Sequence, residues 1–463
     1  MARVALVFLL LTANSVCWAF ETREKPAEYE ELYAWAYPIV SNMNAIRGLM
    51  RGALPMFGPV KVNEFVHARR PMAPEDKFVS PNVDVLFSIA IMDLSQGPIA
   101  LELPDTKQRY YVLQFLDPWT NSFAYLGKRS TGTEPGSFLI VGPDDDLSSS
   151  ALETFDGRKI VRSPSKLAVA VLRIAIADVD DSSDLHEMQN GFVLIPSIKK
   201  TVREEAIVGP QSMGEYAFWE QLDWAISAYP PSKSELRFVN QVKSFSLGTR
   251  NFNKVSSLKL QTLKLLENQG QIWLEKQATG INETQIDGWN SLIDLFNFNR
   301  DHFGSGVINS KNWIIENLND AVEHRAIAAR IGLWGNHGYE AAFYQAFEDK
   351  NGVRLEGKKI YQLVLQNPPP AKAFWSVTNY TVPDFFLYDN AEQKYSISSY
   401  DKDLKFNDDG SITIIFSHER PDGVLGNWLP TPKGFFRPLL SLYHPDLQKI
   451  RQFWPSSIQD ITF

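Results

Sequence analysis

Apolar residues recur at helical spacing near the start of the chain and again in its middle. The segment 26–50 has an apolar face at this spacing, with Pro38 as a kink, and predicts one or two amphipathic helices. Further along, apolar residues repeat every three or four positions from about Met213, Leu258 and Lys311. These repeats predict three helices in the middle of the chain.

Shorter apolar runs, alternating or continuous and bounded by turn residues, predict strands of a mainly antiparallel sheet. The first set of predicted strands comprises Val83–Met92, Ile99–Leu103, Tyr110–Leu116, Ser137–Val141 and Leu167–Ile176. Strands return after Asn351, where the Asp-Gly pair within Asn407–Gly410 stands between apolar runs and predicts a hairpin. The pattern therefore predicts β structure, then helices, then β structure again.

The first nineteen residues have the pattern of an export signal. Arg3 precedes the apolar run Val4–Leu11, and small or polar residues lead to Ala19, after which cleavage is expected. The run is too short to span a bilayer, which needs about 20 apolar residues, and no later segment is a transmembrane candidate. The sequence predicts a soluble secreted protein, extracellular or, in a bacterium, periplasmic or in the cell envelope. A lipid anchor on Cys17 is the rival interpretation.

Composition narrows the chemistry further. Cys17 is the only cysteine, so after cleavage disulfides, thiolate metal sites and a cysteine nucleophile are excluded. The formal net charge is −8 without an acidic tail or a basic cluster, which makes nucleic acid a poor partner. The length of 463 residues predicts two or three domains, and the oligomeric state stays open.

Motifs along most of the chain resemble a family. The first group is SPNVDVLFS, LELPDT, RYYVLQFLDPWTNSFAYLGKRSTG and FLIVGP; the second is YQLVLQN, PPAKAFWSVTNY, DNAEQKYSIS, DDGSITI and GNWLPTP. In this order they resemble the secreted proteins that join the domains of unknown function 1254 and 1214, over about residues 60–440.

The resemblance implies a mainly β protein with α structure: two jelly-roll-like antiparallel β-sandwich domains joined by a helical middle region. The expected segments are a signal peptide (1–19), an N-terminal helical segment (20–58), a first sandwich (59–185), a mainly helical region (186–340) and a second sandwich (341–463). The resemblance implies no mechanism. The chain also departs from the family pattern, since it reads SLYHP, with Ser441 and His444, where relatives tend to have RLYWP.

Candidate ligand residues gather in the first group of motifs. Asn82 and Asp84 flank Val83 at the start of a predicted strand, so their side chains should point the same way and hold a cation or hydroxyls. The alternative is that they cap a turn. Arg129, with Thr131 in the same GKRSTG segment, is suited to a carboxylate or phosphate.

The structural alternative for Arg129 is an ion pair with Asp84 or Asp117. None of the seven histidines has metal-ligand spacing. His67, in FVHARR upstream of the Asn82 motif, is the first choice for a functional histidine. No metal site and no cofactor is identified.

The second group adds Asn427 and Trp428, which precede Pro430 in an apparent loop suited to stacking on a sugar or apolar ligand. Most other aromatic residues there are expected in the core. Two glycosylation sequons begin at Asn282 and Asn379, and Asn379 lies within a predicted strand.

These features leave three hypotheses. The leading one is an extracellular ligand-binding or matrix-associated protein, with a small molecule, a glycan or the extracellular matrix as partner. The second is an enzyme in an inter-domain cleft that uses Asp84 and His67 for proton transfer and Arg129 to hold an anion. The third, a metal-dependent oxygenase or hydrolase, needs two neighbouring histidines and rests on fold analogy alone.

Overall fold

The protein is described here from a computed structural model. The structure describes residues 28–145, 154–176, 182–198, 202–279, 285–423 and 426–462. The predicted signal peptide with its cleavage position Ala19, and the sequon at Asn282, lie outside these ranges.

The first β region consists of two five-stranded sheets. One has the order β1 (Val66–His67), β2 (Val85–Asp93), β9 (Leu167–Ala175), β4 (Tyr111–Leu116) and β5 (Ser122–Gly127). The other has the order β10 (Val193–Pro196), β3 (Ile99–Leu103), β6 (Gly136–Val141), β8 (Arg158–Arg162) and β7 (Thr154–Phe155). All strand pairs are antiparallel except β6 with β8.

The sheet that contains β2, β4 and β9 is buried on both faces, which explains its continuous apolar runs. Along β9, Ala170 and Leu172 point into the core between the two sheets, whereas Val169 and Val171 pack against the rest of the molecule. Side chains alternate along a strand. Arg173 therefore lies on the face that turns away from the sandwich core.

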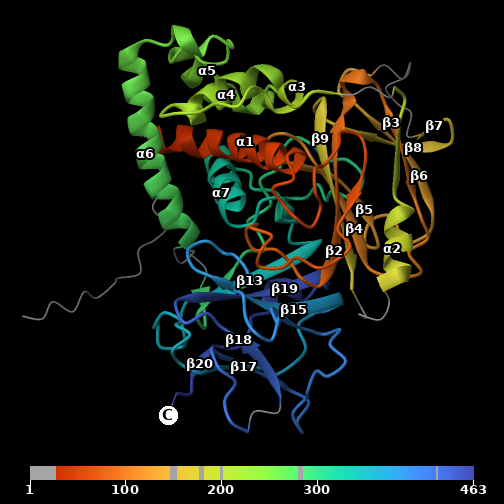
Figure 1. The fold of residues 1–463 in the computed structure, drawn as a ribbon, viewed down its shortest axis with the longest axis vertical. Coiled ribbons are helices and arrows are strands. Elements are labelled where there is room, and N and C mark those ends of the chain that lie inside the picture. Colours follow the sequence, from red (N-terminus) through yellow and green to blue (C-terminus); the bar gives the residue numbers. More distant parts are fainter. Residues whose placement is uncertain are drawn as a thin grey trace, which may run out of the picture.

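Helices cover this outer face (Figure 1). The helices on this side include α1 (Glu28–Met50), α3 (Glu204–Val208), α4 (Ala217–Ala228), α5 (Leu236–Ser244), α6 (Ser257–Thr279) and α7 (Leu318–Ile331), whereas α2 (Ser182–Asn190) packs through Leu185 into the core between the two sheets. Short 3-10 turns lie at Leu94–Gln96, Lys233–Glu235, Phe252–Lys254, Lys311–Trp313 and Ile450–Gln452. The first helix, α1, packs against α4, α6 and α7 and so joins the helices of the middle region.

The second β region also has two sheets. The larger has the order β11 (Gln285–Ile286), β12 (Trp289–Ser291), β13 (Ala341–Ala346), β19 (Phe436–Pro445), β15 (Ala371–Thr381) and β16 (Ser396–Ser398). The smaller has the order β18 (Asn427–Pro430), β17 (Ile412–Ser417), β14 (Tyr361–Leu365) and β20 (Gln459–Asp460), with β17 and β18 parallel.

The larger sheet of the second region lies toward the first β region (Figure 1). Phe436 of β19 packs against Tyr361 and Phe416 of the smaller sheet. The alternate side chains of β19, from Arg437 onward, therefore point toward the first region.

The fold confirms the prediction of a mainly β protein with α structure and a helical middle region. Two local expectations change. The segment around Pro38 forms one helix, α1, that includes Pro38. A tight turn does form at Asn407–Gly410, but it is not a hairpin, because β17 pairs with β14 and β18 instead of the segment before the turn. The domain boundaries remain predictions.

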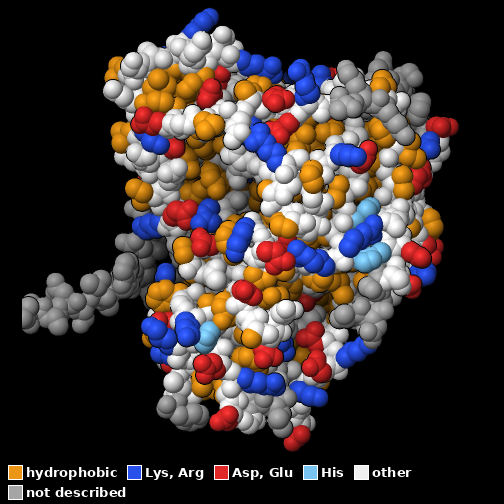
Figure 2. Space-filling view, viewed as in Figure 1, with side chains coloured by type: hydrophobic (Ala, Val, Ile, Leu, Met, Phe, Trp, Pro, Cys, Tyr) orange, Lys and Arg blue, Asp and Glu red, His pale blue; other side chains and the backbone are white. Residues whose placement is uncertain are grey.

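Within the described residues, no helix is long and apolar enough to cross a membrane. On the face in Figure 2, Lys and Arg side chains are interspersed with Asp and Glu side chains.

Candidate functional site

A cavity of about 80 Å³ lies where the two β regions meet the end of α7. Its walls come from the loop before β2, the outer face of the β2–β9 sheet, the segment after β12, the end of α7 and the larger sheet of the second region. The lining residues are Phe78, Val79, Ser80, Pro81, Asn82, Phe87, Arg173, Leu292, Leu295, Phe296, Ile331, Gly332, Leu333, Gly335, Asn336, Phe343, Tyr380, Arg437, Leu439, Ser441 and Tyr443.

Strand β19 shows how the sequence builds one wall. Every second residue, namely Arg437, Leu439, Ser441 and Tyr443, lines the cavity. This is the two-residue period of a strand with one face turned to the site. Of the two positions at which the chain was expected to depart from the family pattern, Ser441 lines the cavity and His444 does not.

Arg437 is 1% exposed. Its Nη1 donates to Gln345 Oε1 over 3.1 Å, its Nη2 donates to the Ser80 hydroxyl, and its Nε has no acceptor. The guanidinium lies over the ring of Phe385, 4.3 Å from its centroid. Burial lowers the pKa of Arg437 to about 10. No described carboxylate forms an ion pair with this group.

Arg173 enters the cavity from the opposite wall and is 8% exposed. Its Nη1 donates to the side-chain oxygens of Gln114 (2.9 Å) and Asn336 (3.2 Å), and its Nη2 donates to the carbonyl of Trp334 (2.8 Å). All of these acceptors are neutral. Burial lowers the pKa of this arginine too. The cavity therefore receives two buried cations whose guanidinium groups donate hydrogen bonds to neutral acceptors.

The loop before β2 has an uncommon backbone at Ser80, with φ of 48°. Its amide donates to the carbonyl of Phe385 (2.8 Å), and its hydroxyl donates to the carbonyl of Ile331 (2.7 Å). Left-handed non-glycine residues persist where surrounding contacts hold them. These bonds join the loop to the second region and to α7 at the cavity wall.

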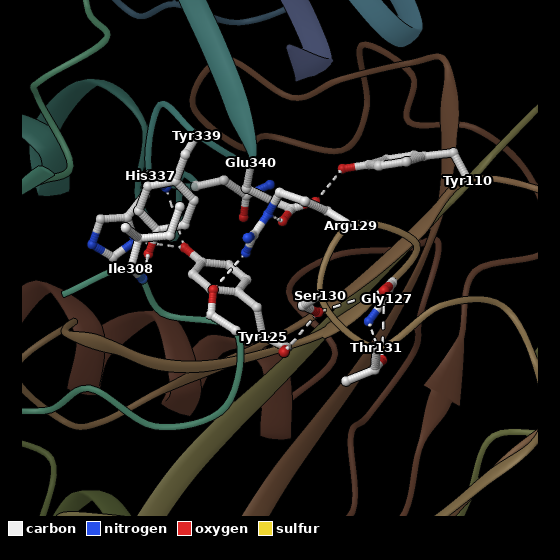
Figure 3. Close-up of polar contacts among 12 residues, drawn as sticks. Tyr110, Tyr125, Gly127, Arg129, Ser130, Thr131, Ile308, His337, Tyr339 and Glu340 are labelled. Atoms are coloured by element: carbon white, nitrogen blue, oxygen red, sulfur yellow. Dashed lines mark hydrogen bonds and ion pairs between the residues drawn. The ribbon is translucent and has the colours of Figure 1, made fainter. Parts of the chain in front are cut away.

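Arg129 lies in a separate polar cluster (Figure 3). Its Nε pairs with Glu340 Oε2, its Nη2 donates to the carbonyl of Gly306 (2.6 Å), and the Tyr110 hydroxyl donates to Glu340 Oε1 (2.9 Å). Although burial alone would lower it, the Glu340 carboxylate raises the pKa of Arg129. The observed partner is thus Glu340, not Asp84 or Asp117. The arginine does not line the cavity.

Next to this pair, the Tyr125 hydroxyl lies 2.9 Å from His337 Nδ1, and the His337 ring stacks on Tyr339 (Figure 3). Burial, then the charge of Arg129, lower the pKa of His337 to about 3. The ring is therefore neutral at physiological pH. Thr131 closes its own turn, because its hydroxyl accepts from the amide of Gly127 over 3.0 Å, and it also hydrogen-bonds Tyr111.

Asn82 and Asp84 form a turn at the start of β2. Asn82 Oδ1 accepts from the amide of Asp84 over 2.7 Å, and Asp84 Oδ1 accepts from the Ser396 hydroxyl of the second region over 2.8 Å. The bond between the Asp84 amide and Asn82 agrees with the alternative prediction that these residues cap a turn. Asn82 also lines the cavity, whereas Asp84 does not. Burial raises the pKa of Asp84 to about 6, although hydrogen bonds to its carboxylate oppose the shift.

The raised pKa of Asp84 predicts a pH-dependent stability. The folded state holds this proton more tightly than the unfolded chain, where the pKa is near 3.8. The contribution to stability is therefore full below about pH 4 and is lost as the pH rises through about 6. At 1.36 kcal/mol per unit, the Asp84→Asn variant should gain about 2 kcal/mol relative to the unsubstituted protein between pH 4 and pH 7, because part of the effect of the shift is already lost at pH 4.

Urea unfolding of both proteins at half-unit pH steps would measure this gain. The same substitution at the exposed Asp384 serves as the control. A stability difference that stays constant from pH 4 to pH 7 would contradict the prediction.

His67 lies away from the cavity. It pairs with Ser88 across β1 and β2, and its Nδ1 lies 2.8 Å from the Ser88 hydroxyl. Burial, and then the charge of Arg69, lower the pKa of His67 to about 4. It is not in hydrogen-bond contact with Asp84, so the structure does not bring the predicted acid–base pair together.

Asn427 and Trp428 line a different, polar pocket of about 230 Å³ in the second region. The Asn427 side chain bonds the backbone of Lys405 in both directions, and Trp428 Nε1 donates to the Ser417 hydroxyl over 2.9 Å. Both side chains are thus held within the second region. Asn379 is 3% exposed, and its Nδ2 donates to the carbonyl of Pro430 over 3.1 Å.

Among the residues that the structure describes, no group of three His, Cys, Asp or Glu side chains could hold a metal ion.

Sequence reasoning missed both cavity arginines. A signal existed in each case: Arg173 interrupts the apolar run LAVAVLRIA, and Arg437 follows two phenylalanines in GFFRPLL. A lone charge within a buried strand calls for a partner.

Comparison with known families identifies both β regions. The family model described as protein of unknown function DUF1254 matches residues 62–196, and the one described as protein of unknown function DUF1214 matches residues 340–447. The chain therefore carries both domains, in the N- to C-terminal order that the motifs predicted.

Solved structures similar to this chain include two bacterial proteins. A crystal structure of a protein from Vibrio parahaemolyticus is 20% identical, with a TM-score of 0.63, and the match covers 94% of this chain and 99% of that one. This likeness shows a shared fold. An uncharacterized protein from Burkholderia cenocepacia is 10% identical, with a TM-score of 0.47 over 94% of this chain and 93% of its own. No curated protein matches the chain.

Proposed function

We propose that the protein binds a small organic molecule in the cavity between its two β regions, and that it does so outside the cytosol. The observation that carries the binding proposal is the character of the cavity walls. Apolar side chains, including Leu295, Phe296 and Leu439, form most of the lining, and a few polar groups converge from separate elements. Small-molecule sites are typically concave, mostly apolar and placed at domain interfaces.

The secreted location is supported by the first nineteen residues alone, and the matrix-associated role has no further support. The enzyme hypothesis loses its proposed residues, because Arg129 is paired with Glu340 while His67 and Asp84 have separate partners. Ligand binding therefore remains the preferred proposal, because it requires no catalytic residues beyond the groups that line the cavity.

A substitution that fills the cavity tests the proposal. Leu439 lines the cavity, whereas Leu447 is 38% exposed and lies outside it. Ligand-observed NMR with a mixture of small neutral and charged molecules should detect binding to the unsubstituted protein and to Leu447→Trp. The same signals should be lost with Leu439→Trp.

Circular dichroism would establish that both variants are folded. The proposal is wrong if no molecule binds the unsubstituted protein, or if folded Leu439→Trp binds as well as Leu447→Trp does.

A further inference from the structure

We infer that the ligand of this cavity is a small carboxylate with a short apolar body, held by Arg437 and Arg173. This inference rests on the proposed function and adds the chemical class of the ligand. It starts from the charges: the two arginines are the charged residues among the lining, and no Asp or Glu lines the cavity.

Two other buried arginines in the described ranges have carboxylate partners, which Arg173 and Arg437 lack as hydrogen-bonding partners. Arg325 forms a two-pronged pair with Glu235, at 2.8 and 2.9 Å, and Arg47 lies 3.5 Å from Glu204. Arg173 and Arg437 are comparably buried but form no such hydrogen-bonded pair; the charge of Glu340 acts on Arg173 from a distance, and no described carboxylate acts on Arg437. A buried cation without a counter-charge is strongly unfavourable. An anion in the cavity would supply the counter-charge that Arg437 lacks and would add to the charge of Glu340 at Arg173.

The free donor of Arg437 gives this anion a contact point. Two nitrogens of its guanidinium are bound to Gln345 and Ser80, while its buried Nε has no acceptor. Arginine is suited to planar carboxylates and to phosphates alike. The charge and the donor by themselves do not separate these two classes.

The remaining walls favour the carboxylate. Leu292, Leu295, Phe296, Leu333 and Phe343 offer no hydrogen-bonding side chain. Phosphate oxygens facing this apolar wall would lose their hydrogen bonds to water without gaining a hydrogen-bond donor from the protein. A few methylene groups would instead fill the apolar wall. The volume of about 80 Å³ is roughly half that of the ~150 Å³ cavity that admits benzene, so the apolar body is short.

Isothermal titration of the full chain with three probes tests this class. Butanoate and butanamide have the same carbon skeleton but differ in charge, and inorganic phosphate has the charge without the apolar body. Butanoate should bind at least about tenfold more tightly than either of the others. Leu447→Trp should retain this preference, and Leu439→Trp should lose it.

The outcomes separate the two proposals. Equal affinities for butanoate and butanamide would overturn the carboxylate inference and leave the ligand-binding cavity in place. Tighter binding of phosphate would overturn it in favour of an inorganic or phosphorylated ligand. If none of the probes binds while the NMR mixture does contain ligands, the carboxylate class is wrong, and if that mixture contains none, the cavity proposal falls as well.

Discussion

Replacing Arg437 by methionine is expected to lower the affinity for butanoate by at least about 30-fold. Removing one partner of a buried charged contact costs 2 kcal/mol or more, and about 1.4 kcal/mol corresponds to a factor of ten. Methionine replaces the aliphatic stem of the arginine but removes the charged guanidinium and with it the free Nε donor. Isothermal titration against the unsubstituted protein measures the loss.

Arg162→Met provides the control, because Arg162 is exposed on β8 and does not line the cavity. Arg437→Lys keeps the charge without the planar group and should fall between the methionine variant and the original protein. Unchanged affinity in Arg437→Met would show that this arginine does not hold the ligand.

The second large effect concerns stability at a buried ion pair among the helices. Arg325→Met is expected to lower the free energy of unfolding by about 3–5 kcal/mol, because it leaves the Glu235 carboxylate buried without its cation. Arg325 is 3% exposed and joins α7 to Glu235, which also accepts from Trp35 Nε1. Urea unfolding followed by tryptophan fluorescence measures the change.

Arg437→Met is the matched comparison for this experiment. It removes an arginine of similar burial but leaves no buried carboxylate behind, so its cost without ligand should be less than half that of Arg325→Met. The double variant Arg325→Met with Glu235→Met should regain a large part of the lost stability, because both charges are removed together. Equal costs for the two arginine substitutions would contradict this account.

Much of the fold could be predicted because apolar runs report burial directly. The predicted strand Ile99–Leu103 matches β3, and Leu167–Ile176 matches β9 to within one residue. The hairpin prediction at Asn407–Gly410 was wrong, because the sequence shows the turn but not the strand pairing. Turn chemistry is local, so the turn formed, but the partner of β17 is β14, whose residues lie about fifty positions earlier.

The candidate site was predicted only in part. Asn82 was singled out by its motif, and it both caps a turn and lines the cavity. Arg129 was selected from the sequence to bind an anion, which is the role now proposed for Arg437. The structure instead pairs Arg129 with Glu340, which lies 211 positions away in the chain. A charged side chain has the same local pattern whether or not a carboxylate from elsewhere neutralises it.

Local patterns in the sequence were enough to predict the order of the β and helical regions, the family motifs and the strand that carries Arg173. These properties depend on neighbouring residues and on burial, which local spacing records. The fold was needed to show that the strand faces of Arg173 and Arg437 meet at one cavity and that, among the described residues, no carboxylate is hydrogen-bonded to either guanidinium. The reason is physical: charge compensation depends on distance in space, and these two residues lie 264 positions apart in the chain.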